Sequence, residues 1–175
     1  MNGRIVGLTL LASGLLAGGG LYWTQVYAFY DEVAAETASV QMTGLVSGVA
    51  EPVAFENFEA IDADSSPLRY RACFDVTASL PTLSETYVIQ DNAVPLEAPG
   101  WFDCYDADEV GEALESGEAI AFLGEANVTY GIDRVVAVFR DGRARAWHQI
   151  NHCGEEVFDG RPAPADCPEP PEREP

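Results

Sequence analysis

The sequence predicts an α+β protein, in which an N-terminal transmembrane helix precedes a small, mostly antiparallel β-sheet domain with one short helix. Three observations support this prediction. Residues 5–30 contain no Asp, Glu, Lys, Arg or His. Residues 68–76 alternate between apolar and polar side chains, as expected of a half-buried strand. Two further apolar runs flank Asp141-Gly142, a dipeptide typical of tight β-hairpin turns.

The composition excludes several classes of function. The 175 residues include 29 acids and 9 basic residues, all of them Arg, for a net charge of −20. An apolar share of 47% suits one globular core and is too high for a disordered acidic chain. The charge argues against nucleic acid or an anionic membrane surface as a partner, because phosphate binding needs clustered Lys and Arg. Without Lys the chain has no Walker lysine, no phosphate-binding kinase lysine and no Schiff-base chemistry.

The apolar segment 5–30 is long enough to cross a membrane. As a helix it would extend about 39 Å, more than the hydrocarbon core of about 30 Å. Arg4 and the amino terminus are the positive charges near its start, whereas Asp31 and Glu32 follow its end. By the positive-inside rule, residues 1–4 stay in the cytoplasm and the chain after the segment is exported. The sequence therefore predicts a signal-anchor helix in contact with membrane lipid.

A cleaved signal peptide is the competing interpretation of this segment. Residues 15–17 (LLA) would form the cleavage site, but the position that requires a small side chain holds Leu15. The apolar run also continues well beyond Ala17. We therefore expect an uncleaved anchor, and both interpretations export the rest of the chain.

Three glycines in the anchor, Gly7, Gly14 and Gly18, fall near one helical face. The last two form a GxxxG step, which lets two helix backbones approach closely in lipid. These glycines are the candidate helix-packing residues, and they predict a membrane-protein partner. The alternative is that glycine is simply frequent in membrane helices.

The exported part divides into three segments. Residues 31–39 are expected to form a stalk or to continue the helix briefly. Residues 40–160 have the length and patterning of one α+β domain. Residues 161–175 are rich in Pro and acids, which favours an extended tail pinned at most by Cys167.

The clearest helix in the domain begins after Asp106. Asp106 supplies an N-cap, Glu109 the acid three residues later, and Gly117 a stop signal. Residues 53–61 and 86–90 are shorter strand candidates.

The predicted hairpin also specifies a register. With a two-residue turn, Val135 faces His148 and Val136 faces Trp147.

The four cysteines are the disulfide candidates: Cys73, Cys104, Cys153 and Cys167. An exported domain with four cysteines is expected to form two disulfides, and three pairings are possible. Pairing Cys153 with Cys167 would close a loop of about 15 residues, worth about 3 kcal/mol in the chain-entropy model. Pairing Cys73 with Cys104 would then join the alternating strand to the start of the helix.

The candidate metal ligands are His148 and His152, with Cys153 beside them. In a continuous strand the two histidines would share a face about 13 Å apart. A turn after Ile150 would be needed to bring them together around copper or zinc. Cys153 cannot be a disulfide partner and a thiolate ligand at once. The favoured alternative is that His148 packs on the hairpin and His152 lies in a loop.

The sequence gives no basis for assigning catalytic or cofactor-binding residues. It has no GxSxG nucleophile motif, no CxxC redox motif and no CxxCH haem-attachment motif. Carboxylates are so abundant that no acid–base pair can be singled out.

Four runs are distinctive: residues 98–104 (APGWFDC), 130–137 (YGIDRVVA), 147–151 (WHQIN) and 153–155 (CGE). Together they resemble a family of uncharacterised single-pass membrane proteins from alphaproteobacteria. The likeness extends from the anchor to the CPEPP run that begins at Cys167. The resemblance implies a bacterial inner-membrane protein with a periplasmic C-terminal domain, and it implies no activity or site residue.

Some members of that family carry a histidine kinase label, which the residues here contradict. The exported domain has no glycine-rich nucleotide lid and no Lys, and it is expected on the side of the membrane that lacks ATP. His148 is predicted in a strand and not on a dimerisation helix.

The sequence thus favours a non-catalytic binding or assembly module that docks on a basic periplasmic protein or a membrane complex. The alternative is a metal-handling protein that uses His148 and His152. A third possibility, a hydrolase with acidic catalytic groups, has no residues to assign.

Overall fold

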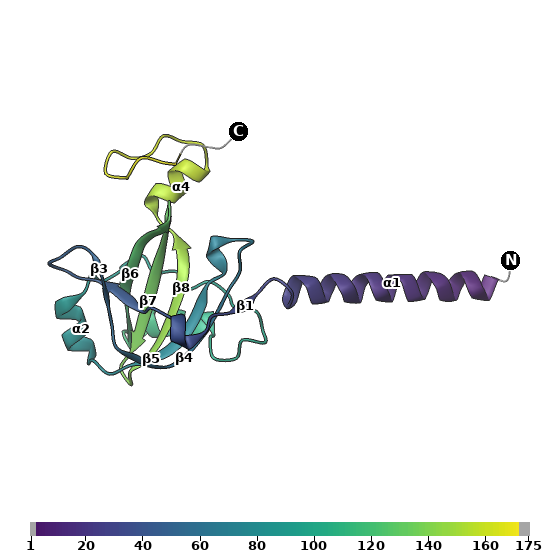
Figure 1. The fold of residues 1–175 in the computed structure, drawn as a ribbon, viewed down its shortest axis with the longest axis horizontal. Helices are drawn as coiled ribbons and strands as arrows, with labels where there is room; N and C mark the ends of the chain where they lie inside the picture. The colour runs from purple at the N-terminus through teal and green to yellow at the C-terminus, as the bar shows by residue number, and fades with distance from the viewer. Residues whose placement is uncertain (1–2, 172–175) are drawn as a thin grey trace.

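The computed structural model describes residues 3–171 and contains the predicted N-terminal apolar helix. Helix α1 (Gly3–Val26) projects away from a β-rich domain, and none of its residues is buried in the chain (Figure 1). Its 24 residues include an 18-residue window with a mean hydropathy of 1.7, so it is long and apolar enough to cross a membrane. The helix ends at Val26, four residues before the predicted end at Tyr30.

Aromatic side chains attach the end of α1 to the domain. The indole Nε1 of Trp101 donates a hydrogen bond to the carbonyl of Val26 at 2.7 Å. Tyr27 stacks on the same indole with ring centroids 5.9 Å apart, and Tyr30 meets it edge-on. The C-terminal end of the apolar helix is therefore fixed against the loop that precedes α3 (Ala107–Ser116).

The domain is built on an antiparallel six-stranded sheet with the order β1-β4-β5-β8-β7-β6. The strands are β1 (Asp31–Glu32), β4 (Phe55–Asp62), β5 (Arg71–Val76), β6 (Ala119–Thr129), β7 (Ile132–Phe139) and β8 (Arg143–Ile150). A separate pair, β2 (Gln41–Thr43) and β3 (Ala50–Pro52), packs beside β6. The α+β class and the mostly antiparallel sheet are confirmed.

The segment expected as a stalk lies along the edge of this sheet. Asp31 pairs with Asp62 of β4, and the N–H of Val33 donates to the carbonyl of Ala60 at 2.9 Å. A short 3-10 helix, η1 (Ala35–Thr37), follows. Residues 31–39 therefore do not continue α1.

Two apolar clusters cover the two faces of the sheet. The first contains Phe74, Phe122 and Val136 together with Met42 of β2. The second contains Val135 and Trp147, and α3 covers it with Val110 and other side chains. Because both faces are covered, β5 is buried along most of its length and not half-buried as the alternation predicted.

The predicted α3 is confirmed at both ends. Asp106 Oδ1 accepts hydrogen bonds from the backbone N–H groups of Asp108 and Glu109, at 2.9 and 3.1 Å. Gly117 ends the helix with a φ of +74°, which glycine adopts without strain.

Other local predictions were wrong. Leu68 lies in a 3-10 helix, η2 (Pro67–Arg69), and not in the alternating strand. Residues 86–90 form no strand: Thr86 ends helix α2 (Leu80–Thr86), and Tyr87 and Ile89 form isolated bridges. The sequence analysis missed α2 and its N-cap at Ser79. A further helix, α4 (His152–Phe158), follows β8, so the domain has three α-helices among the described residues where one was expected.

The hairpin between β7 and β8 forms one residue out of the predicted register. Val135 pairs with Trp147, and Arg134 pairs with His148. Three residues connect the strands, and the last of them, Gly142, has a φ of +92°. A three-residue loop ending in left-handed glycine changes the pairing by one position relative to a two-residue turn. The slip places His148 on the opposite face from the one predicted.

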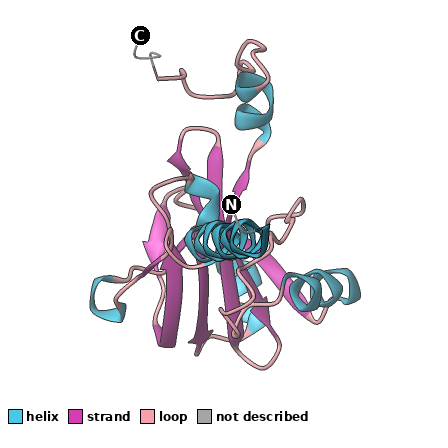
Figure 2. Cartoon of the chain, turned by 90° about the vertical axis from the view of Figure 1, so that its right-hand side faces the viewer, coloured by secondary structure: helices cyan, strands magenta, loops and turns pink. Residues whose placement is uncertain are grey.

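Helix α4 and the C-terminal segment lie beyond the end of β8 and the start of β7, away from α1 (Figures 1 and 2). The turn between β6 and β7 lies at the same end of the sheet, because Asn151 donates its N–H to the carbonyl of Gly131. This end carries the candidate functional site.

Candidate functional site

A cleft lies between the junction of β8 with α4, the end of β6 and the loop that includes Asn92 and Val94. Its volume is about 760 Å³. Apolar side chains contribute part of its lining, at Leu68, Val94, Leu96, Leu123, Ala126 and Ile150. Three carboxylates also line it, those of Asp133, Glu155 and Asp166. No arginine is among the described residues that line the cleft.

A hydrogen-bonded cluster around Asp133 forms one wall. Asp133 is 8% exposed, and its Oδ1 accepts from the N–H of Asn127 at 2.9 Å and from Asn151 Nδ2 at 2.6 Å. Asn127 Oδ1 in turn accepts from the N–H of Gly131. Within residues 3–171 no hydrogen bond is found to Asp133 Oδ2. The cluster ties the β6–β7 turn to the start of α4 and leaves one carboxylate oxygen for a ligand.

Close backbone packing fixes the position of α4. Asn151 caps the helix, its Oδ1 accepting from the N–H of Gly154 at 3.0 Å. Gly154 lies directly against Gly131, and a Cβ on Gly154 would collide with the Gly131 carbonyl oxygen. Gly131 itself has a φ of +79°. These contacts hold His152 and Glu155 at the rim of the cleft.

The opposite wall is held by two buried polar side chains of the sheet. Gln149 accepts from the N–H of Val94 at 3.0 Å and donates to the carbonyl of Asn92 at 2.9 Å. Arg71 donates to the carbonyls of Leu96 and Glu97 at 2.7 and 2.8 Å. The loop has little regular structure, so these side chains determine its path.

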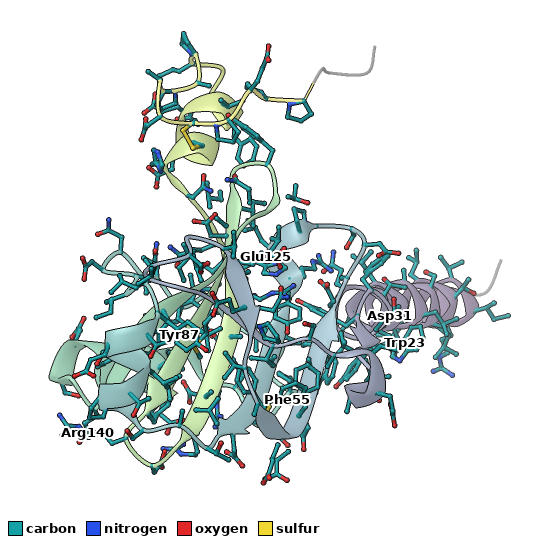
Figure 3. The ribbon with its side chains drawn as sticks, turned by 60° about the vertical axis from the view of Figure 1, so that its left-hand side comes forward. Trp23, Asp31, Phe55, Tyr87, Glu125 and Arg140 are labelled. Carbon is teal, nitrogen blue, oxygen red and sulfur yellow. A yellow bond between two sulfur atoms is a disulfide. The ribbon has the colours of Figure 1, made fainter. Side chains whose placement is uncertain are left out.

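The two disulfides join Cys73 with Cys104 and Cys153 with Cys167. The second lies beside α4, where Figure 3 shows its sulfur–sulfur bond. His152 Nε2 lies 3.5 Å from Cys153 Sγ, 3.3 Å from Cys167 Sγ and 3.1 Å from Asp166 Oδ2. The tail expected from residue 161 is thus covalently attached to α4.

His148 does not join His152 at this rim. It is 5% exposed and stacks on Tyr70 with ring centroids 4.7 Å apart. Its Nε2 accepts from Arg134 Nε at 3.0 Å, which leaves the proton on Nδ1 to be donated to the carbonyl of Pro67 at 2.7 Å. Both ring nitrogens are therefore engaged, and the candidate metal ligands His148 and His152 do not come together.

Burial lowers the pKa of His148 to about 4, because the imidazolium would lose its hydration between the sheet and Tyr70. The hydrogen bond to Pro67 opposes this effect, and the nearby guanidinium groups of Arg134 and Arg71 add to it. In the unfolded chain the ordinary pKa of 6.5 applies. Between these values the unfolded state binds more protons, so the folded state loses stability as the pH falls.

Lowering the pH from 7 to 4 is therefore expected to remove about 3 kcal/mol of folding free energy through His148. Urea unfolding of the full chain in micelles at a series of pH values measures this loss. The variant His148→Gln should show a smaller loss over the same range, because the titrating group is gone. The matched control His152→Gln removes an exposed imidazole and should leave the free energy of unfolding at pH 7 within about 1 kcal/mol of wild type. Equal pH dependence of His148→Gln and wild type would contradict the assignment.

The candidate helix-packing glycines lie on the exposed α1. A Cβ at Gly7, Gly14 or Gly18 would meet no atom within 4 Å. The face they form therefore has no packing role within the described chain.

The sequence analysis identified His152 and Cys153 but missed the acids and amides around them. Asp133 and Asp166 cannot be distinguished from the other acids in a sequence that has 29 of them. Gln149 belongs to no motif that would mark it as a site residue. The Asn127 and Asn151 side chains meet because a turn and a helix cap converge, which no spacing rule predicts.

The sequence model of a family of unknown function, DUF6446, matches residues 40–168. The match spans both disulfides and every residue that lines the cleft, and it stops short of α1. No curated protein and no solved structure matches the chain.

Proposed function

Because the chain belongs to DUF6446, a family of unknown function, we propose its role from its own residues: a membrane-anchored, non-catalytic docking module. Its acidic cleft receives a basic segment of an exported or membrane-bound partner. The observation that carries the proposal is the lining of the cleft, in which three carboxylates are combined with apolar side chains and no arginine among the described residues. Carboxylates attract guanidinium and ammonium groups, and apolar side chains bury the stems of Arg and Lys.

In this proposal α1 is an uncleaved anchor in a bacterial inner membrane, and the domain lies in the periplasm. Arg4 before the helix and the acids after it support this orientation. Two disulfides fit an oxidising compartment outside the cytoplasm. The resemblance to alphaproteobacterial single-pass proteins supports the same location. The kinase label finds no support in His148, which is buried and hydrogen-bonded at both ring nitrogens.

The net charge of the whole chain adds to the local attraction. The net charge of −20 favours encounter with a basic partner from a distance, and salt screens this attraction. The glycine face of α1 offers a second contact if the partner also has a membrane helix.

The proposal is tested with the full chain in uncharged detergent micelles and a fluorescent peptide of alternating Arg and Leu as the probe. We expect binding that weakens about tenfold between low and high salt, as charge-dependent association does. The variant Glu155→Gln/Asp166→Asn should bind about tenfold more weakly than wild type at low salt. The control Asp108→Asn/Glu115→Gln removes the same charge from the exposed face of α3 and should change the affinity by less than about twofold.

Affinity purification with mass spectrometry then identifies the natural partner. A partner retained by wild type and the α3 control, and lost by the cleft variant, would agree with the proposal. Peptide binding that is insensitive to salt, or equal in the two double variants, would exclude the cleft as the docking site.

A further inference from the structure

We propose that Cys153, Cys167 and His152, with Asp166 beside them, form a metal site when the Cys153–Cys167 disulfide is reduced. The ion is Zn²⁺ or a similar borderline-soft divalent cation. This inference concerns the rim of the cleft and does not depend on a basic partner.

The first argument is the convergence of donor atoms. His152 Nε2, Cys153 Sγ and Cys167 Sγ all lie within 4.8 Å of one another. Two thiolates, an imidazole and a carboxylate are a ligand set that tetrahedral zinc accepts. While the disulfide is intact, the sulfurs carry no negative charge and are poor ligands, so the site exists only in the reduced protein.

The second argument is the spacing around the imidazole. In a tetrahedral site with a Zn–S distance of about 2.3 Å and a Zn–N distance of about 2.0 Å, the nitrogen lies about 3.5 Å from each sulfur. His152 Nε2 is 3.5 Å from Cys153 Sγ and 3.3 Å from Cys167 Sγ. Asp166 Oδ2, at 3.1 Å from the same nitrogen, is close to the corresponding spacing for an oxygen ligand. The nitrogen therefore already has the separations that the metal requires.

The third argument is how each ligand is held. Cys153 is 3% exposed on α4, whose position the Gly131–Gly154 contact fixes. Cys167 is half-buried in a segment without regular secondary structure, held by one turn hydrogen bond from its N–H to the Pro164 carbonyl. One side of the site is thus rigid, and the other can shift as the sulfurs separate around the ion.

The chemistry balances with a dithiol as the reductant. The dithiol transfers two electrons and two protons to the disulfide, becomes a disulfide itself, and leaves Cys153 and Cys167 as thiols. Binding of the cation then displaces the two thiol protons and forms two metal–thiolate bonds.

The chain supplies its own control in the other disulfide. Cys73 is 5% exposed within the second apolar cluster, and the only two histidines are His148, which is engaged elsewhere, and His152. Reduced Cys73 and Cys104 would have thiolates and no imidazole, so they are not expected to form this site.

The experiment uses the full chain in micelles, reduced with dithiothreitol and freed of it under argon, with Co²⁺ as the spectroscopic probe. We expect one Co²⁺ per chain, thiolate-to-cobalt charge-transfer bands and the visible bands of a tetrahedral ion, all removed by excess Zn²⁺. The unreduced protein should show none of these bands. His152→Ala should weaken Co²⁺ binding at least tenfold, whereas His148→Ala should not weaken it.

A second measurement locates the thiols without relying on any cysteine variant. Alkylation followed by mass spectrometry should show Cys153 and Cys167 labelled after reduction, and Zn²⁺ should protect them at least tenfold in wild type but not in His152→Ala. Absence of the charge-transfer bands in reduced protein whose Cys153 and Cys167 are shown to be free would overturn the proposal. So would bands of equal strength in His152→Ala, or protection by Zn²⁺ that falls on Cys73 and Cys104 instead.

Discussion

Replacing Cys73 and Cys104 together by alanine is expected to lower the free energy of unfolding by about 4 kcal/mol. The bond closes a loop with a sequence separation of 31 and removes chain entropy from the unfolded state. It also joins the central strand β5 to the loop that leads into α3. Its loss therefore loosens the loop and the helix that cover the second apolar cluster. Urea unfolding of the full chain in micelles, followed by tryptophan fluorescence, measures the change.

The variant Cys153→Ala/Cys167→Ala is the matched control. Its disulfide has a sequence separation of 14 and attaches the C-terminal segment to α4, outside the sheet. The chain-entropy model assigns this shorter loop about 3 kcal/mol, and the freed segment covers less of the core. A larger loss in this control than in the Cys73/Cys104 variant would contradict the structural role assigned to the first bond.

Replacing Arg71 by methionine is expected to lower the free energy of unfolding by about 4 kcal/mol. Arg71 is 4% exposed, and its guanidinium donates to four backbone carbonyls, those of Leu68, Tyr70, Leu96 and Glu97. Methionine would fill similar volume but would leave buried carbonyl groups without donors, at about 1 to 3 kcal/mol each. Because two of these carbonyls belong to the loop that walls the cleft, the variant should also bind the basic peptide probe more weakly.

The control for this prediction is Arg143→Met. Arg143 pairs with Glu109 and Asp141 at the surface, where ion pairs contribute about 0 to 1 kcal/mol. We expect this variant to unfold within about 1 kcal/mol of wild type in the same urea titration. Similar losses for the two arginine variants would show that the buried hydrogen bonds of Arg71 do not stabilise the domain.

Elements defined by local signals were predictable from the sequence. The apolar run gave α1 its length, and Asp106 and Gly117 gave α3 its two ends, because capping depends on residues that are adjacent in the chain. The identity of β7 and β8 as a hairpin was equally local. Their register was not, because it depends on whether the connection holds two or three residues, and Asp-Gly is compatible with both.

In the candidate site, too, the sequence supplied the residues but tertiary contacts decided their environments. His148 and His152 are four residues apart, yet His148 is buried, stacked on Tyr70 and hydrogen-bonded to Arg134, whereas His152 is exposed at the rim of the cleft. The register slip and the beginning of α4 at His152 separate their environments. Neither could be derived from spacing within a single strand.

The sequence by itself determined a long apolar N-terminal segment, a strongly acidic domain after it, the α+β class and the absence of lysine, since these depend on composition and on local pattern. Only the tertiary structure decided which faces of the sheet are covered, which cysteines pair, and that Asp133, Glu155 and Asp166 share one cleft. The physical reason is that contacts between distant residues form through packing. The local sequence pattern shows which side chains are apolar or charged. Which of these side chains come into contact depends on how the sheet and its loops pack.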